Sequence, residues 1–471
     1  MVGAGGAGLY AALTAARSGA SVVLISATPL AQTASYWAQG GLAAALAEDD
    51  SPEIHLADTE IAGRGIVRHS AAEVLVAEAP AAVADLQSYG VSFDGDRNGR
   101  LSLSLEGGHS RRRVVHAGGS ATGRRVVRQL SGVVVEEPRI TVIEGARAAG
   151  LWLHEGRCVG VVCEDGRSVS GRATILATGG AAAMWSRTTN PPGSVGIGMM
   201  LAHAAGAALA DLEFVQFHPT AVTGVPGREG FLVTEAIRGE GATLLDPDGE
   251  RFVEELQPRD EVSRAVAAVM RERGVSHVDL DMRRVDPLKF QNVVGALRES
   301  GLDPTTQLVP VSPAVHYFMG GIVADLDGAT SVPGLYAIGE SSCTGLHGAN
   351  RLASNSLSEC FVWGHRAANA SLDEPYPVTD RPPEPAKLEL PSQSTREALW
   401  RDAGIVRTPE GLQQLLEDPH PLARMVARCA LMRTESRGAH HRTDYPELNP
   451  GLDGHHAVVL GGDESSYEQW S

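Results

Sequence analysis

The chain has 471 residues, which is too long for one ordinary core and predicts two or three domains. Its content of 43% hydrophobic and 21% charged residues is typical of a globular protein and excludes a fibrous or disordered chain. The formal net charge of -17 repels polyanions, so the run Arg111, Arg112 and Arg113 is a poor nucleic-acid patch and we expect no nucleic-acid partner.

Cysteine usage and apolar runs indicate the compartment. The odd number of cysteines and the lack of zinc-type spacing predict a reducing cytosol, no disulfide framework and no metal site. These cysteines are Cys158, Cys163, Cys343, Cys360 and Cys429. No signal peptide is predicted, because the N-terminus runs straight into glycines. No membrane span is predicted either, because the best candidate, 195–209, is broken by glycines and His203 and is typical of a buried helix. We expect a soluble, cytoplasmic protein without a membrane partner.

The first 25 residues predict a strand, a turn, a helix and a second strand. Residues 1–8 read M-V-G-A-G-G-A-G, 9–17 have helical composition, and 22–25 are strand-like. Only Met1 and Val2 precede the glycines, so the first strand is short. We interpret the short first strand as the result of a trimmed start or a late start codon.

Two later strand-like runs also end in glycine. Residues 173–177 lead into Thr178-Gly179-Gly180, and 335–338 lead into Gly339-Glu340. This pattern predicts an α/β fold whose Rossmann-like parallel sheet is assembled from distant segments, with another domain inserted between them. The predicted domains are a nucleotide-binding domain at 1–211 and 319–388, an inserted α+β capping domain at 212–318, and a C-terminal helical domain at 389–471. A Pro- and Glu-rich stretch at 375–391 is typical of a linker before that last domain.

The glycine spacing indicates a phosphate site. Gly3, Gly5 and Gly8 have Gly-x-Gly-x-x-Gly spacing at the start of a helix, whose free amides can bind a pyrophosphate. The alternative is a glycine-rich structural turn. Residues 33–42 read T-A-S-Y-W-A-Q-G-G-L, and their glycines can bring backbone against a flat ring, although a plain loop is the alternative.

With these pieces the chain resembles the flavoprotein superfamily of fumarate reductase, succinate dehydrogenase and L-aspartate oxidase. The resemblance runs in order through G-A-G-G-A-G, Y-W-A-Q-G-G, E-G-G-H-S-R-R-R-V-V-H-A, A-T-G-G, Q-F-H-P-T, T-E-A-I-R-G-E-G, P-R-D, H-Y-F-M-G-G, A-I-G-E and N-R-L-A-S-N-S-L. It covers nearly the whole chain and implies an FAD-binding domain at 1–211 and 319–388.

The resemblance implies a set of FAD-binding residues. They are Gly3, Gly5, Gly6, Ala7, Gly8, Ser26, Ser35, Tyr36, Gln39, Gly40, Gly41, Thr178, Gly179, Glu340, Asn355, Ser356 and Leu357. Glu340 at a strand end can accept ribityl hydroxyls, with a helix-capping carboxylate as the alternative. Ser26 stands where a ribose-binding carboxylate is usual, so ribose recognition is open.

Two positions depart from the superfamily pattern. Members with covalent flavin attach it to a histidine five positions before the Gln of Q-G-G, where this chain has Ala34, so noncovalent FAD is expected. Relatives tend to carry Gly-Asp-Gly where this chain reads Gly196-Ile197-Gly198, and the lost polar contact predicts weaker flavin binding.

A dicarboxylate substrate needs several donors, because both carboxylates must be neutralised while the α-hydrogen faces the flavin. The resemblance places His218, Thr234, His316 and Arg351 as substrate-binding residues, and their side chains are donors of the required kind. Satisfied core histidines and a loop-pinning arginine are the alternatives.

Arg259, in Pro258-Arg259-Asp260, is the acid/base residue that the resemblance implies, with Glu235, Arg238 and Glu240 as a proton relay. The very high pKa of arginine argues against a simple base, and an ion pair with Asp260 or Glu261 is the alternative.

Glu106 begins the motif that separates the aspartate-oxidising members from the others, and a carboxylate suits a substrate ammonium. A solvated loop glutamate is the alternative, and His109 and His116 of the same motif are structural candidates.

The function implied by this resemblance is oxidation of L-aspartate to iminoaspartate with reduction of FAD, as the first step of NAD biosynthesis from aspartate. Oxygen or fumarate would reoxidise the flavin, and quinolinate synthase would consume the product. Two rivals are a succinate dehydrogenase or fumarate reductase flavoprotein subunit, against which Ala34 and Glu106 argue, and a degenerate flavin-fold protein that no longer turns over.

Overall fold

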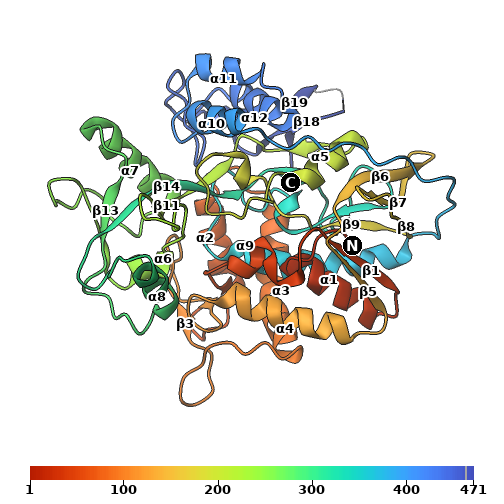
Figure 1. The fold of residues 1–471 in the computed structure, drawn as a ribbon, viewed down its shortest axis with the longest axis horizontal. Helices are drawn as coiled ribbons and strands as arrows, with labels where there is room; N and C mark the ends of the chain where they lie inside the picture. Colours follow the sequence, from red (N-terminus) through yellow and green to blue (C-terminus); the bar gives the residue numbers. More distant parts are fainter. Residues whose placement is uncertain (462–463) are drawn as a thin grey trace.

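The structure is a computed structural model that describes residues 1–461 and 464–471. The fold is α/β, with a Rossmann-like main domain, an α+β capping domain and a C-terminal region that is mostly helical. In Figure 1 the capping domain lies at the left in green, the main domain occupies the centre and right, and the blue C-terminal region lies along the top. Among the described residues, no helix has both the length and the apolar composition needed to cross a membrane.

The main domain is built on a parallel sheet. Val2 forms parallel bridges to Ile25 and to Leu176, and so joins two strand pairs that are distant in sequence. One pair is β1 (Val22–Ser26) with β5 (Ile140–Glu144), and the other is β9 (Thr174–Leu176) with β16 (Leu335–Ala337). The predicted parallel sheet of distant segments is confirmed, and the short first strand occupies its centre.

Helices cover one face of this sheet. Their apolar sides form a core with Leu24, Ile175 and Ile338 of the sheet region. The helices are α1 (Gly6–Arg17), α2 (Pro52–Ala62), α3 (His69–Ser88), α4 (Thr122–Glu136) and α9 (Asn355–Ala370). Because α1 and α9 pack directly on each other, segments 350 residues apart are held together at the glycine-rich turn.

Smaller elements complete the main domain. An antiparallel sheet of β6 (Ala148–His154), β7 (Arg157–Cys163) and β8 (Ser168–Ser170) lies at its outer end (Figure 1). The remaining elements are β2 (Leu42–Ala43), β3 (Leu103–Ser104), β4 (Val114–Val115), α5 (Ile197–Ala204), β10 (Leu209–Ala210), β15 (Gly321–Val323) and β17 (Ser342–Cys343). Helix α5 falls within the apolar run for which a buried helix is predicted.

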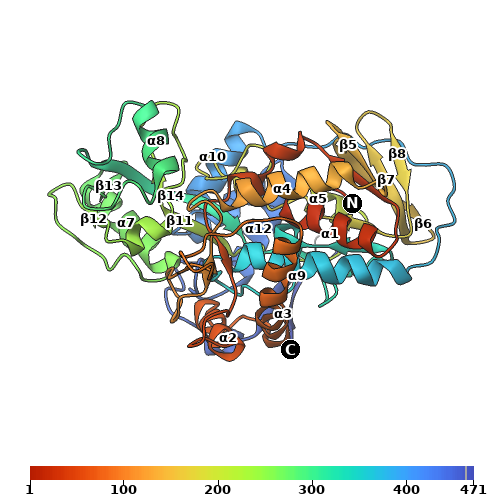
Figure 2. The same ribbon diagram turned by 90° about the horizontal axis from the view of Figure 1, so that it is seen from below.

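The capping domain has its own core and its own antiparallel sheet, in the order β11, β14, β13, β12. The bounds are β11 (Val215–Val222), β12 (Thr243–Leu245), β13 (Val278–Asp281), β14 (Val309–Phe318), α6 (Glu235–Gly239), α7 (Arg259–Arg273) and α8 (Gln291–Glu299). Helix α7 has acids in its first turn, bases in its last turn, and Gly274 in the left-handed conformation at its end. Figure 2 shows this domain projecting to one side of the main domain.

The C-terminal region packs on the main domain. It contains the predicted helices, as α10 (Gln393–Asp402), α11 (Pro409–Leu415) and α12 (Pro421–Met432). It also contains two strands that the sequence analysis did not predict, β18 (His455–Val459) and β19 (Ser465–Gln469). Strand β18 pairs with β10 and so extends a sheet of the main domain.

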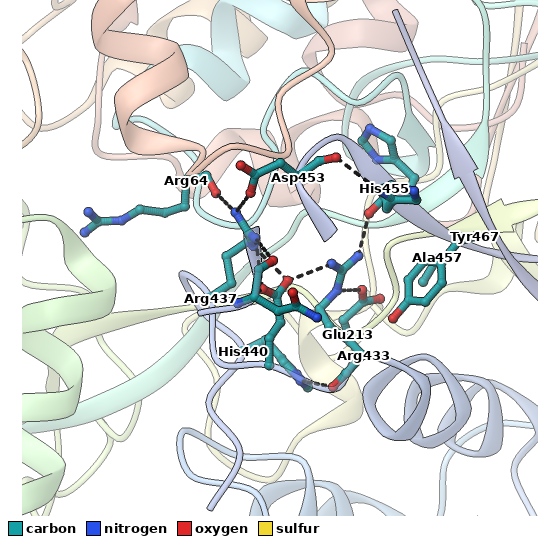
Figure 3. A network of polar contacts seen from close by, with 12 residues as sticks. Arg64, Glu213, Arg433, Arg437, His440, Asp453, His455, Ala457 and Tyr467 are labelled. Carbon is teal, nitrogen blue, oxygen red and sulfur yellow. Dashed lines mark hydrogen bonds and ion pairs between the residues drawn. The ribbon is translucent and has the colours of Figure 1, made fainter. Parts of the chain in front are cut away.

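Buried ion pairs join this region to the rest of the protein (Figure 3). Arg433 donates from Nε to Glu213 at 2.6 Å and from Nη1 to Glu435 at 3.0 Å. Arg437 donates to both oxygens of Glu435 and to the carbonyl of Arg64. Because these groups are buried, their mutual pairing fixes the C-terminal region in place.

Candidate active site

A cavity of about 910 Å³ lies along the glycine-rich turn and the ends of the parallel strands. Its lining reaches the capping domain at Leu232, His316 and Tyr317. It therefore connects the region predicted to bind the cofactor with the region predicted to bind the substrate. The predicted cofactor residues that line it are Gly3, Gly5, Ala7, Ser26, Ser35, Thr178, Gly179, Glu340, Ser356 and Leu357.

The turn at Gly3 and Gly8 admits no side chain. A Cβ at Gly3, where φ is +105°, would lie 2.2 Å from the carbonyl oxygen of Ala177. A Cβ at Gly8 would lie 1.9 Å from the carbonyl oxygen of Gly3. Both glycines let α1 begin close against the sheet, which leaves the helix N-terminus open to the cavity.

The residues present fit a flavin dinucleotide. Thr178 Oγ1 lines the cavity, is buried and has no hydrogen-bond partner within the described chain, so it is available to a bound group. Glu340 accepts a hydrogen bond from the Phe318 amide at 3.0 Å, and burial raises its pKa to about 7. A volume of this size, a helix N-terminus for phosphates and a carboxyl for ribityl hydroxyls agree with FAD.

Seven predicted cofactor residues do not line the cavity. They are Gly6, Gly8, Tyr36, Gln39, Gly40, Gly41 and Asn355. Several of them shape its walls: the Gly6 amide donates to Ser35 Oγ at 3.0 Å, and the Gly41 amide donates to Ser354 Oγ at 3.2 Å. The Asn355 side chain points toward His55: its Oδ1 lies 2.8 Å from His55 Nε2. This contact holds the start of α9 against α2.

The two positions that depart from the superfamily pattern both line this cavity. Ala34 belongs to a short 3-10 helix, η2 (Ala34–Trp37), and offers only a methyl group. Ile197 is the first residue of α5 and also offers no polar atom beyond its backbone. Neither side chain can bond covalently or by hydrogen bonding to a flavin.

His218 and His316 come together on neighbouring strands. They lie on β11 and β14, and their ring centroids are 5.2 Å apart. Burial, followed by the charges of the nearby arginines, holds the pKa of both imidazoles well below the usual value, so both are neutral at pH 7. Thr189 Oγ1 lies 2.8 Å from His316 Nδ1 and fixes the ring. Two neutral imidazoles can donate hydrogen bonds to an anion without carrying charge.

Gln216 joins the two arginines of the site. Its Oε1 accepts a hydrogen bond from Arg259 Nη1 and another from Arg351 Nη2, each at 3.1 Å. Arg351 also donates to Ser356 Oγ, lies over the Tyr317 ring, and has its pKa lowered to about 10 by burial. Its Nε has no partner among residues 1–461 and 464–471, so this guanidinium retains a free donor.

Arg259 pairs with Glu235 rather than with its chain neighbours. Its Nε donates to Glu235 Oε2 at 2.7 Å, while Asp260 faces Arg64 instead. Glu235 is buried, which alone would raise its pKa, but Arg259 and Arg238 lower that pKa to about 2. Arg238 Nη2 lies 3.7 Å from Glu235. A chain of buried charged groups therefore runs from Arg259 through Glu235 to Arg238. Glu240 does not belong to it, because Glu240 is exposed and pairs with Lys289.

Glu106 lies at the same site. It is 4% exposed and accepts a hydrogen bond from Ser354 Oγ at 2.7 Å, so it is not a solvated loop residue. Its other oxygen is buried, 3.5 Å from His116 Nε2. His109 is turned away and contacts the Ala353 carbonyl. Thr234 is buried at the start of α6, directly before Glu235.

Gln216, Ser354 and Tyr317 belong to this site, and the sequence analysis did not single them out. Gln216 was within reach, because it lies two residues before His218 in Q-F-H-P-T and alternate residues of a strand share a face. Ser354 has φ of +62°, and its role depends on how the loop before α9 meets Glu106.

Comparisons with known proteins agree with this geometry. The family model described as an FAD binding domain matches residues 1–357, and the one described as a fumarate reductase flavoprotein C-terminus matches residues 416–467. The chain is 44% identical to the L-aspartate oxidase of Caulobacter vibrioides over 480 residues, covering 96% of this chain and 94% of that one. It is 39% identical to the L-aspartate oxidase of a Nostoc species over 538 residues, covering 97% and 92%.

Solved structures extend the same likeness. A variant of FrdA from E. coli quinol fumarate reductase superposes with a TM-score of 0.88 at 28% identity. The superposition covers 99% of this chain and 95% of that chain.

Proposed function

The chain belongs to the L-aspartate oxidase family of FAD-binding flavoproteins, and from that premise we propose how its site oxidises L-aspartate to iminoaspartate. The observation that carries the proposal is the group of buried arginines and neutral histidines at the inner end of the cofactor cavity. Arg351 Nε and two nitrogens of Arg238 have no hydrogen-bond partner among the described residues, so this group retains cationic donors for an anion. L-aspartate carries one net negative charge and so complements it.

We assign the substrate contacts by the donors left free. His316 lines the cavity, and its ring centroid lies 5.2 Å from that of His218. Arg351 donates to Ser356 of the lining, so we assign these three residues, with the buried Thr234, to the two substrate carboxylates. Glu106 binds the substrate ammonium, which selects L-aspartate over succinate. A charge-assisted hydrogen bond of this kind contributes about 1.5 to 3 kcal/mol.

Bound FAD supplies the acceptor for two electrons and the α-hydrogen. The chain's own residues hold the α-carbon toward the flavin cavity and handle the proton that accompanies transfer. Arg259 is the acid/base residue, and Glu235 and Arg238 connect it to its surroundings. When fumarate is the acceptor, one of its carbons needs a proton, and the Arg259 guanidinium is placed to donate it.

The cofactor is held noncovalently, because Ala34 offers no nucleophile where other superfamily members carry a histidine. The reaction is the first step of NAD biosynthesis from aspartate, with oxygen or fumarate as electron acceptor. We place the enzyme in the cytoplasm, where quinolinate synthase would consume the unstable imine.

Anaerobic titration of the FAD-loaded protein tests the proposal. L-aspartate should bleach the flavin absorbance and succinate should not. Glu106→Gln should slow the bleaching about tenfold or more, since it removes one charge-assisted contact. Glu48→Gln, which changes an exposed glutamate, is the matched control and should leave the rate unchanged.

Two results would overturn the assignment. Bleaching by succinate as readily as by L-aspartate would favour the succinate dehydrogenase or fumarate reductase reading. Protein that takes up FAD but is never bleached by L-aspartate would favour a degenerate flavoprotein.

A further inference from the structure

A second cavity, of about 770 Å³, lies outside the active site where the capping domain meets the main domain. One wall is the first two turns of α4 with the loop before it, and the other is the segment that leads into α8. The backbone of this segment comes close: a Cβ at Gly119 would lie 3.3 Å from the carbonyl oxygen of Lys289. In both ribbon views the N-terminal end of α4 points toward α8 (Figures 1 and 2).

The charge of this cavity is opposite to that of the chain. Its lining includes Arg124, Arg125, Arg128 and Lys289 and no Asp or Glu, in a protein whose net charge is -17. Within the described ranges, 1–461 and 464–471, none of the three arginines forms an ion pair with an acid. Arg128 only stacks over the Tyr36 ring, at 5.6 Å. Arg125 and Arg128 are exposed and Arg124 is half-buried, so water screens their mutual repulsion and their guanidinium groups can pair with an anion that enters the cavity.

Ser120 gives an independent indication. It lines the cavity and is only 8% exposed, yet its Oγ has no hydrogen-bond partner in the part of the chain that the structure describes. A buried hydroxyl without a partner costs free energy unless a ligand or water satisfies it. The nearby acids are otherwise engaged: Asp94 accepts hydrogen bonds from the Gly118 and Gly119 amides, and Glu240 pairs with Lys289.

We propose that this cavity is a binding site for a small molecule that carries two or more linked phosphates. Guanidinium groups pair with phosphate oxygens in a fork geometry, and a serine hydroxyl adds a donor. Three arginines carry more charge than one carboxylate needs and match a pyrophosphate group, while Lys289 on the opposite wall adds a cation that it shares with Glu240. The volume suits a ligand of nucleotide size. Because the walls come from two domains, the bound anion holds the capping domain against the main domain.

Calorimetric titration of the FAD-loaded protein with inorganic pyrophosphate tests this site without any assay of activity. Saturation with FAD first fills the flavin cavity, so the titrant cannot bind there. We expect one site per chain, and Arg124→Gln combined with Arg125→Gln should weaken binding about tenfold or more. Arg97→Gln is the matched control. It changes an exposed arginine that does not line the cavity, and the variant should bind pyrophosphate like the unchanged protein.

Lys289→Gln gives a second variant on the opposite wall. It should also weaken binding, whatever the folding yield of the arginine double variant. The proposal is overturned if pyrophosphate at about 1 mM gives no saturable binding, or if Arg97→Gln weakens binding as much as the double variant does. L-aspartate oxidation is not part of this readout, so failure here is distinguishable from failure of the proposed function.

Discussion

Two buried arginine networks in this protein differ in how completely their donors are used. In the C-terminal network, Arg433 and Arg437 each donate from all three nitrogens to acids or carbonyls (Figure 3). In the active-site network, Arg351 Nε and two nitrogens of Arg238 have no hydrogen-bond partner among the described residues.

The pKa values follow the same contrast. Burial would lower the pKa of Arg433, but Glu213 and its other acidic neighbours raise it above the usual value. Burial lowers the pKa of Arg351 to about 10, since acids do not fully compensate it. A network whose guanidinium donors are all used stabilises the fold, whereas one that keeps free donors is ready for an anionic ligand.

The largest expected effect is on catalysis. Arg259→Gln removes the proposed proton donor and should lower kcat about 10²- to 10⁴-fold in turnover of L-aspartate with fumarate as acceptor. Steady-state assays under nitrogen measure this. Glu254→Gln, a change at an exposed residue before α7, serves as control, and an Arg259→Gln enzyme with unchanged kcat would refute the acid/base role.

The second largest expected effect is a loss of unfolding free energy when the C-terminal arginine network is disrupted. Arg433→Gln leaves Glu213 and Glu435 buried without their shared cation, which should cost about 3 to 5 kcal/mol of unfolding free energy. Thermal unfolding of the FAD-loaded protein measures it. Arg381→Gln, at an exposed ion pair, should leave the unfolding midpoint unchanged. Equal midpoints for the two variants would contradict the claim that the C-terminal network stabilises the fold.

The corresponding arginine change in the active site should affect catalysis more than stability. Arg351→Gln should lower kcat/KM for L-aspartate about 100-fold, because a charge-assisted contact to a substrate carboxylate is lost. It should lower the unfolding midpoint less than Arg433→Gln does, since it removes contacts to Gln216, Ser356 and Tyr317 but leaves no pair of buried acids without a cation. If Arg351→Gln is destabilised as much as Arg433→Gln but keeps its kcat/KM, Arg351 stabilises the fold and does not bind the substrate.

The smallest effect concerns pH. His218 is neutral in the folded protein because burial lowers its pKa, whereas in the unfolded chain its pKa is about 6.5. The unfolded state therefore binds an extra proton below about pH 6.5, and stability falls as pH decreases by about 1.4 kcal/mol per pH unit for this one group.

His218→Asn should accordingly lose less stability than the unchanged protein between pH 6.5 and pH 5. The measurement is the unfolding midpoint at each pH. His365→Asn, which changes an exposed histidine, should follow the unchanged protein, and a His218→Asn curve parallel to both would contradict the burial argument.

Much of the fold was within reach of the sequence because it depends on local chemistry. Gly3 and Gly8 are needed where a Cβ would meet backbone oxygen, and strands that end in glycine mark the edge of a parallel sheet. The strands β18 and β19 were not predicted, since β18 is held by pairing with β10, more than 200 residues away, and β19 pairs only with β18. Such pairing leaves no periodic signal of its own.

The active site divides in the same way. His218, His316 and Arg351 were predicted to converge and do so through neighbouring strands and Gln216. Gln39, Gly40 and Gly41 remain predicted flavin contacts, and none of the three is among the described residues that line the cavity. Sequence spacing indicates which residues share a loop, but only packing decides which face the ligand.

Binding of succinate to the oxidised, FAD-loaded protein tests the central claim most directly, because it isolates the anion site from turnover. Titration followed by the flavin spectrum should show saturable binding, weakened about tenfold or more by Arg351→Gln and unchanged by Arg381→Gln. Equal succinate affinity in the unchanged protein and in Arg351→Gln would contradict the view that the free donors of the buried arginines form the substrate site.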